Sequence, residues 1–140
     1  MKDKEQEMGK NKGMKLLIID DEVEFAATLC RRLQLRNIDA VDAHSGKEGL
    51  TRLAEVNPNI VILDLKMHDM SGLDVLEKIK ASDASIEVIM LTGHGSARAG
   101  IEAGEKGAFA YIIKPVDLPD LLLKIDEAVK KQTEGDEGRG

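Results

Sequence analysis

Acidic residues follow two short apolar runs in this sequence. Asp20 and Asp21 come directly after LLII, and Asp64 comes directly after IVIL. An ionised carboxylate at the end of an apolar run loses hydration, so a cation or a hydrogen-bond donor must compensate its charge. Three carboxylates held close together repel one another unless they share a cation, and oxygen ligands suit a hard divalent ion such as Mg²⁺. The pattern therefore indicates a Mg²⁺ site, if the fold brings the two runs together.

Two other polar residues follow apolar runs in the second half of the chain. Thr92 comes after VIML, and Lys114 comes after YII. The lysine supplies a fixed positive charge and the threonine a short hydroxyl donor. Beside a carboxylate nucleophile and a metal ion, these groups are the components of phosphoryl transfer. Each residue alone also has an ordinary structural explanation; Asp21 with Glu24, for example, matches a helix-capping pattern.

Five apolar runs alternate with five segments of helical spacing. The runs suit strands buried on both faces, as in a parallel sheet covered by helices. They are KLLIID, IDAV, NIVILD, IEVIML and AFAYII. The helical segments cover roughly residues 23–33, 45–56, 72–81, 96–106 and 117–130. The alternation predicts an α/β fold, a doubly wound five-stranded parallel sheet flanked by five helices. Ligands of such sheets bind beyond the carboxyl ends of the strands, where all five polar residues should emerge.

Size and composition indicate one globular domain. We expect a folded domain over residues 14–131, a disordered charged leader over 1–13 and a flexible tail over 132–140. The net charge of −6 and the aromatic content of 2% argue against direct nucleic-acid binding. No apolar run approaches the roughly 20 residues that cross a bilayer, so we expect no membrane insertion and a cytoplasmic location. Cys30 falls on a helical apolar face and should be a small buried residue.

Four short segments resemble the signature segments of response-regulator receiver domains from two-component signalling. They are IIDDE, VILDLKM…MSG, LTGHGS and YIIKP, in the family's order and at the expected strand ends. The resemblance spans about residues 14–131 and implies the flavodoxin-like receiver fold. It also implies a signalling switch, which catalyses only its own phosphorylation and dephosphorylation. Its partners would be a sensor histidine kinase or phosphotransfer protein and a downstream target protein.

The resemblance assigns the phosphorylation and metal-binding residues. Asp64 matches the aspartate that takes a phosphoryl group from a phosphohistidine. Asp20 and Asp21 match the acidic pair that binds Mg²⁺, with Asp21 as the direct ligand. The backbone carbonyl of Lys66 matches a further protein contact to the metal, in a set that includes Asp64.

The resemblance also assigns the residues that contact the phosphoryl group and those that switch. Lys114 matches the lysine that pairs with phosphoryl oxygens, and its bond to Pro115 matches the family's cis peptide. Thr92 matches the hydroxyl that closes on the phosphoryl group, and Gly93 would leave the pocket open. Tyr111 matches an aromatic residue that turns inward with Thr92 and changes the surface around the fourth helix, the fifth strand and the fifth helix. Strands also favour tyrosine for packing alone.

Two features leave alternatives open. His68 stands where the family usually has proline, so it is either a solvated loop residue or a contact for groups near the metal. The fourth helical segment, GSARAGIEAGEKG, is rich in glycine, and each interior glycine costs a helix about 1 kcal/mol relative to alanine. The segment is therefore either a weakly held moving part or a helix that packs close to the sheet.

Other functions agree less well with the residues. A haloacid-dehalogenase-type phosphatase needs a second acid two residues after its nucleophile, where this chain has Lys66. A flavin site needs loops that accept phosphate, which the acidic DDE repels, and GHGSAR has Arg98 in place of the third glycine of a dinucleotide site. A phosphorylation-independent binding module and a receiver fragment of a longer regulator with an output domain remain alternatives. A homodimer through the fourth and fifth helices is also left open.

Overall fold

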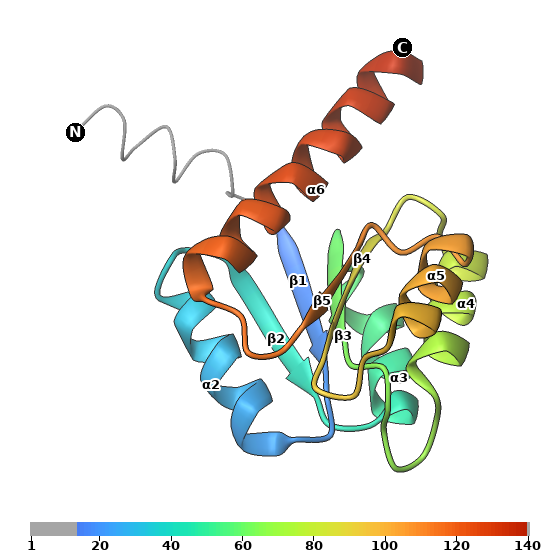
Figure 1. Cartoon of the computed structure of the whole chain (residues 1–140). Helices are drawn as coiled ribbons and strands as arrows, with labels where there is room; N and C mark the ends of the chain where they lie inside the picture. The colour runs from blue at the N-terminus through green and yellow to red at the C-terminus, as the bar shows by residue number, and fades with distance from the viewer. Residues whose placement is uncertain (1–13, 140) are drawn as a thin grey trace.

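The computed structural model describes residues 14–139, so the expected leader over 1–13 and the final Gly140 lie outside the described residues. Five strands alternate with five helices (Figure 1). In chain order they are β1 Lys15–Ile19, α2 Val23–Gln34, β2 Asp39–Ala43, α3 Gly46–Val56, β3 Ile60–Leu63, α4 Gly72–Ser82, β4 Glu87–Thr92, α5 Ala97–Glu105, β5 Ala110–Ile113 and α6 Leu118–Arg139. The predicted α/β alternation is confirmed.

The strands form one parallel sheet in the order β2-β1-β3-β4-β5. The direction of winding reverses between β1 and β3, which places the topological switch point of the sheet between these two strands. Ile19 at the end of β1 pairs with Leu63 at the end of β3. The backbone N–H of Asp64 continues this ladder by donating to the carbonyl of Ile19 at 2.9 Å. The register therefore brings Asp20 and Asp64 to neighbouring positions at the switch point.

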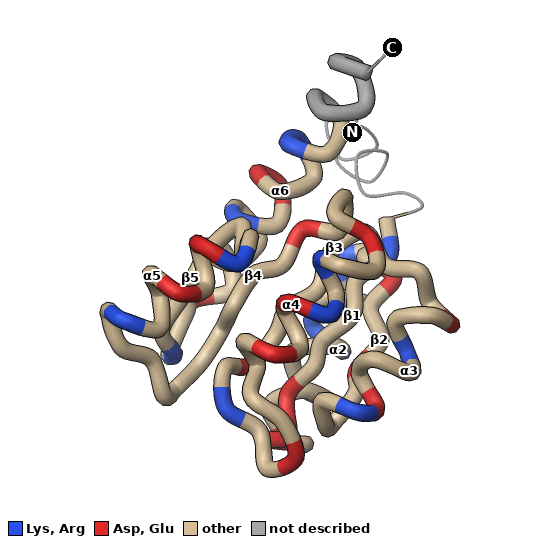
Figure 2. Tube along the Cα trace, turned by 90° about the vertical axis from the view of Figure 1, so that its right-hand side faces the viewer, with Lys and Arg blue, Asp and Glu red and all other residues tan. Residues whose placement is uncertain are grey.

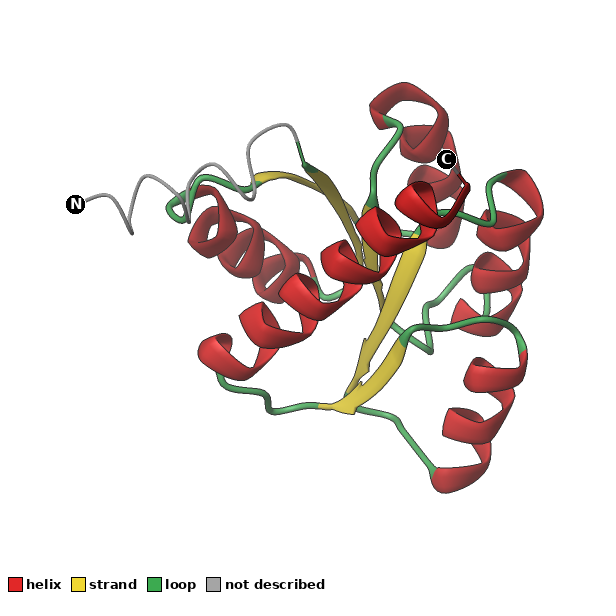
Figure 3. Ribbon diagram, turned by 90° about the horizontal axis from the view of Figure 1, so that it is seen from above, coloured by secondary structure: helices red, strands yellow, loops and turns green. Residues whose placement is uncertain are grey.

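Helices cover both faces of the sheet (Figure 3). Alternate strand residues belong to two hydrophobic cores, one on each face. Leu16 and Ile18 belong to a core shared with α2 and α6. Leu17 and Ile19 belong to a core shared with α3, α4 and α5. Because both faces are covered, the central strands read as continuous apolar runs in the sequence.

Serine side chains fix the starts of three helices. Ser45, Ser71 and Ser96 each accept a hydrogen bond from a backbone N–H of the following first turn, at α3, α4 and α5 respectively. The alternative explanation of Asp21 and Glu24 as a cap of α2 is not supported. The residue before α2 is Glu22, whose side chain makes no capping hydrogen bond, and the Asp21 carboxylate accepts from the backbone N–H of His68 instead.

The last helix is longer than the sequence pattern predicts. The apolar period ends near Lys130, yet α6 continues to Arg139. Gln132 holds the added turn against the amino edge of the sheet, because its amide donates to the carbonyls of Asn59 and Ser85 at 2.6 and 2.9 Å. None of the described helices has the length and apolar character required to span a membrane.

Cys30 is a buried core residue, as predicted. The residue is 6% exposed, and its thiol donates to the carbonyl of Ala40 at 3.3 Å. Acidic and basic residues are intermixed along α4 and α5 on the face shown in Figure 2.

Candidate functional site

An acidic cluster occupies the switch point of the sheet. Asp20 and Asp21 follow β1 and Asp64 follows β3, and one carboxylate oxygen of each lies within 4.8 Å of the others. Asp20 and Asp64 are each 2% exposed. The Oδ1 atom of Asp64 is buried and has no hydrogen-bond partner within residues 14–139. An uncompensated carboxylate oxygen beside two further carboxylates suits a divalent cation with oxygen ligands.

Asp20 is held by two donors. Its Oδ1 accepts from the backbone N–H of Glu22 at 2.9 Å, and its Oδ2 accepts from Nζ of Lys114 at 2.9 Å. Burial raises the pKa of the Asp20 carboxyl, and the negative charge of Asp64 adds to this, while the bonds from Lys114 and Glu22 act in the opposite direction. Ionised Asp20 is therefore less stable than an ordinary surface aspartate.

Lys114 reaches the cluster from the end of β5. Its peptide bond to Pro115 is cis, as predicted. Its ammonium also lies 3.3 Å from Oε1 of Glu22 and 3.9 Å from the ring centre of Phe25. Burial works to lower the pKa of Lys114, but the hydrogen bond and the charge of Asp20 outweigh it, so the pKa is raised and the lysine stays charged. Its closest ion-pair partner in the structure is Asp20.

Asp21 is bonded by the loop that carries Asp64. Its Oδ2 accepts from the backbone N–H of His68 at 2.9 Å and lies 3.2 Å from Nδ1 of the same residue. The structure therefore favours the second alternative for His68, a contact to groups near the predicted metal site. Lys66 is exposed in the same loop, where its backbone pairs with Ser71.

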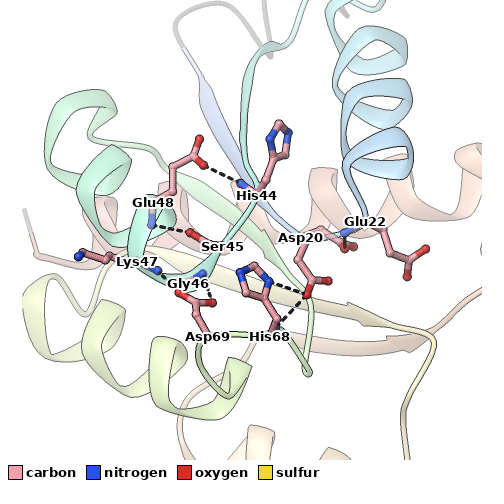
Figure 4. A network of polar contacts seen from close by, with 10 residues as sticks. Asp20, Glu22, His44, Ser45, Gly46, Lys47, Glu48, His68 and Asp69 are labelled. Atoms are coloured by element: carbon pink, nitrogen blue, oxygen red, sulfur yellow. Dashed lines mark hydrogen bonds and ion pairs between the residues drawn. The ribbon is translucent and has the colours of Figure 1, made fainter.

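Two contacts close the loop between β3 and α4. Gly72 donates its N–H to the carbonyl of Leu65 at 2.6 Å, and a Cβ at Gly72 would collide with the backbone of Asp64 and Leu65. Asp69 accepts from the backbone N–H groups of Gly46 and Lys47 at 2.9 Å each, and Figure 4 shows its carboxylate facing the start of α3. These two donors hold the pKa of the Asp69 carboxyl below its ordinary value.

Thr92 and Gly93 lie at the end of β4. Thr92 is fully buried, and its Oγ1 accepts from the backbone N–H of His94 at 3.1 Å. Its carbonyl accepts from the backbone N–H of Lys114 at 2.8 Å. A Cβ at Gly93 would meet only Cδ of Lys114, at 3.9 Å. Space for a Cβ is therefore left at Gly93.

Tyr111 is half-buried on β5 and bonded to the start of α5. Its hydroxyl accepts from the backbone N–H of Ser96 at 3.0 Å. A Cβ at Gly100 would lie 3.1 Å from the Tyr111 ring. A Cβ at Gly95 would collide first with Cδ1 of Ile113 and then with the Tyr111 hydroxyl. A Cβ at Gly104 would meet nothing within 4 Å. Close packing against the tyrosine therefore explains Gly100, and packing against Ile113 together with the tyrosine explains Gly95. Neither contact explains Gly104.

The structure brings together Asp20, Asp21, Asp64 and Lys114, while Thr92 and Gly93 lie at the next strand end. Sequence reasoning missed the contacts of Glu22, Phe25 and Asp69. Glu22 stands next to the acidic pair, which was a usable signal. Nothing in the sequence indicated the contacts of Phe25 and Asp69, because these depend on how a helix and a loop pack.

A family comparison supplies the deciding observation. The family model described as response regulator receiver domain matches residues 16–126. The chain belongs to this family. Membership confirms the resemblance drawn from the four segments: residues 16–126 form a receiver domain, a signalling switch of two-component systems.

Relatives and solved structures agree. The receiver domain is 35% identical over 116 residues to the transcriptional regulatory protein GlrR of Escherichia coli, covering 83% of this chain and 26% of GlrR. A receiver domain protein of Clostridium thermocellum superposes with a TM-score of 0.81 at 36% identity, over 86% of this chain and 97% of that one. A response regulator of Burkholderia pseudomallei, whose structure has a phosphorylated aspartic acid, a calcium ion and citrate, gives a TM-score of 0.77 at 26% identity, over 91% and 75%. The chain spans from a quarter to just over half of the length of its curated relatives.

Proposed function

We propose that the receiver domain accepts a phosphoryl group on Asp64 and so switches a surface that controls a partner protein. The observation that carries the proposal is the buried, unbonded Oδ1 of Asp64 within the carboxylate cluster at the switch point. Such a carboxylate opposes folding, which indicates a chemical role instead of a packing role. The phosphorylated aspartic acid and calcium ion in the Burkholderia relative support this assignment.

The carboxylate cluster is suited to Mg²⁺. Asp20, Asp21, Asp64 and the backbone carbonyl of Lys66 would supply its protein contacts, and Asp21 would be the direct ligand of the Asp20–Asp21 pair. A bound Mg²⁺ would neutralise the cluster and withdraw charge from phosphoryl oxygens. The protein contributes by holding the carboxylates at neighbouring strand ends, so that little reorganisation is needed before transfer.

The donor would be a phosphohistidine on a sensor histidine kinase or a phosphotransfer protein. A carboxylate oxygen of Asp64 forms a bond to phosphorus while the P–N bond to the donor imidazole breaks, and that electron pair stays on the imidazole nitrogen. The product is an acyl phosphate on Asp64. Water later attacks the phosphorus, which releases inorganic phosphate and regenerates the carboxylate.

Lys114, Thr92 and Gly93 would receive the new phosphoryl oxygens. Lys114 already carries its charge at the site and would exchange part of its contact with Asp20 for a phosphoryl oxygen. Thr92 would turn its hydroxyl from the N–H of His94 toward the same group. The open space at Gly93 would leave room for this movement.

The switch would pass through Tyr111 to the face formed by α5, β5 and α6. Inward movement of Thr92 would open space for the Tyr111 ring, whose bond to the N–H of Ser96 would then break and release the start of α5. The partner would be a separate target protein or an output domain in a longer regulator. The second case is favoured by the greater length of the curated relatives.

Intact mass after incubation with Mg²⁺ and acetyl phosphate tests the proposal, with Asp64→Asn beside the wild-type protein. We expect a gain of one phosphoryl group in the wild type and none in the variant. Equal gain in both would show that Asp64 is not the acceptor. If neither gains mass, binding of beryllofluoride distinguishes a short-lived adduct from an inactive site.

A further inference from the structure

We infer that His68 is a positioning residue for Asp21 and that its backbone amide is the group that acts. The inference rests on the proposed function, because it concerns the carboxylate expected to bind Mg²⁺. His68 lies four residues after Asp64, and its N–H donates to Oδ2 of Asp21 across 47 residues of chain. A residue in the loop after β3 therefore orients a predicted metal ligand in the loop after β1.

The bond from His68 fixes one oxygen of the Asp21 carboxylate. The Asp21 side chain is 24% exposed, so packing alone leaves it free to rotate about the Cβ–Cγ bond. A donor on Oδ2 removes that freedom before a cation arrives. Partners of this kind orient metal ligands and raise affinity, and their loss costs about 10–100-fold in metal binding.

The amide can do this because the next residue anchors the loop. Asp69 accepts from the N–H groups of Gly46 and Lys47 at 2.9 Å each, so the backbone at 68–69 is held between the β1–α2 loop and the start of α3 (Figure 4). A backbone donor in an anchored loop loses little entropy when it forms a hydrogen bond. Its position is then set by the fold instead of by a side-chain rotamer.

The imidazole ring contributes less than the amide. Its Nδ1 lies 3.2 Å from Oδ2 of Asp21, but 69% of the His68 side chain is exposed. Water competes for an exposed ring, and the side chain must lose rotamer freedom to make the contact. Removing the ring while keeping the N–H should therefore leave most of the positioning effect.

Isothermal titration of the receiver domain with Mg²⁺ separates the two groups. His68→Ala keeps the N–H and removes the ring, whereas His68→Pro removes both, because proline has no N–H. We expect the Kd of His68→Ala to stay within about twofold of the wild type and that of His68→Pro to rise about tenfold. His44→Ala, which removes a histidine paired with Asp42 instead, serves as the control and should bind like the wild type.

Equal Kd values for His68→Pro and His68→Ala would overturn the inference. If circular dichroism shows that His68→Pro does not fold, NMR of the wild-type protein tests the inference instead. We expect a measurable scalar coupling between the His68 amide nitrogen and Cγ of Asp21, together with slow exchange of the His68 amide. If neither the coupling nor the slow exchange is found, the inference is overturned. A wild type that shows the coupling but neither binds Mg²⁺ nor gains a phosphoryl group would instead contradict the proposed function.

Discussion

Lys114 Nζ and Asp20 Oδ2 lie 2.9 Å apart, with 13% and 3% of their side chains exposed. The pair joins residues that follow β5 and β1, two strands that are not neighbours in the sheet. The lysine side chain therefore extends across the carboxyl edge of the sheet to Asp20 and makes no direct ion pair with Asp64. Arrival of a phosphoryl group would give Lys114 a second anion, so this ion pair is the contact that phosphorylation should weaken.

Lys114→Ala should strongly destabilise the Mg²⁺-free protein. The substitution leaves Asp20 buried beside two other carboxylates, and breaking a buried pair in this way costs about 3 kcal/mol. Urea unfolding in EDTA measures the loss. Lys124→Ala is the matched control, because Lys124 pairs with Glu127 on the exposed face of α6 and should cost less than about 0.5 kcal/mol. Equal losses in the two variants would show that the Lys114–Asp20 pair adds nothing.

Asp64→Asn should have the opposite effect in the absence of metal. It removes a buried charge whose Oδ1 has no partner in the described residues, and we expect the free energy of unfolding to rise by about 1 kcal/mol. At a Mg²⁺ concentration of about 100 times the Kd, the wild type should gain about 2.7 kcal/mol and the variant clearly less. Urea unfolding with EDTA and with Mg²⁺ checks both parts. A variant that is less stable than the wild type in EDTA would contradict the uncompensated charge.

The contacts at the carboxylate cluster show how much of the site the sequence could predict. Asp20 and Asp64 could be placed together because a parallel sheet brings the carboxyl ends of its strands to one edge, whatever the side chains do. The partner of Lys114 could not be predicted, because a long side chain can reach several carboxylates at the site. The bond from His68 to Asp21 and the bonds from Gly46 and Lys47 to Asp69 depend on loop backbone, which carries no periodic signal.

The end of α6 shows the same limit in a helix. The apolar period predicts the turns that pack on the sheet, through Ala128 and its neighbours. It does not predict the turn at Gln132, which is held by two loop carbonyls, because those acceptors come from residues distant in the sequence.

Gly104→Ala and Gly100→Ala separate two explanations for the glycines of α5. Alanine is favoured over glycine in a helix by about 1 kcal/mol, and Gly104 has open space for a Cβ, so Gly104→Ala should raise the free energy of unfolding by about that amount. At Gly100 the Cβ would lie 3.1 Å from the Tyr111 ring, which should cancel much of the gain. Urea unfolding of both variants measures the difference.

The same pair tests the contact between Tyr111 and the start of α5, on which the proposed switch depends. Displacement of the ring in Gly100→Ala should weaken its bond to Ser96 and speed amide exchange at Ser96, whereas Gly104→Ala should leave that exchange unchanged. Equal gains in stability and equal exchange in the two variants would argue that the ring does not limit the packing of α5.

Asp69→Ala should lower stability in a pH-dependent way. The carboxylate accepts from two N–H groups at the start of α3, and the loss of such a cap costs about 1 kcal/mol at pH 7. Because the folded pKa lies below that of the unfolded chain, the contribution of Asp69 is complete above about pH 3.9 and is lost as the pH falls through the folded value. Urea unfolding at decreasing pH should therefore show a difference between the wild type and the variant that is constant above about pH 3.9 and shrinks as the pH falls below it. Asp69→Asn keeps one acceptor oxygen and should lose less, with a difference from Asp69→Ala that does not change with pH.

Lys66 and His94 should control the lifetime of the acyl phosphate on Asp64. Both side chains are exposed, two residues beyond Asp64 and Thr92, where their bulk and charge would restrict attacking water. Their replacement by alanine keeps the backbone carbonyl of Lys66 and the N–H that His94 donates to Thr92, so the site itself should remain intact. The double variant should be phosphorylated to the same level as the wild type and lose the group faster, on the order of tenfold, which corresponds to about 1.4 kcal/mol in the barrier. Release of inorganic phosphate after removal of the donor gives the rate; an unchanged rate would mean that water reaches the phosphorus by a route that neither side chain borders.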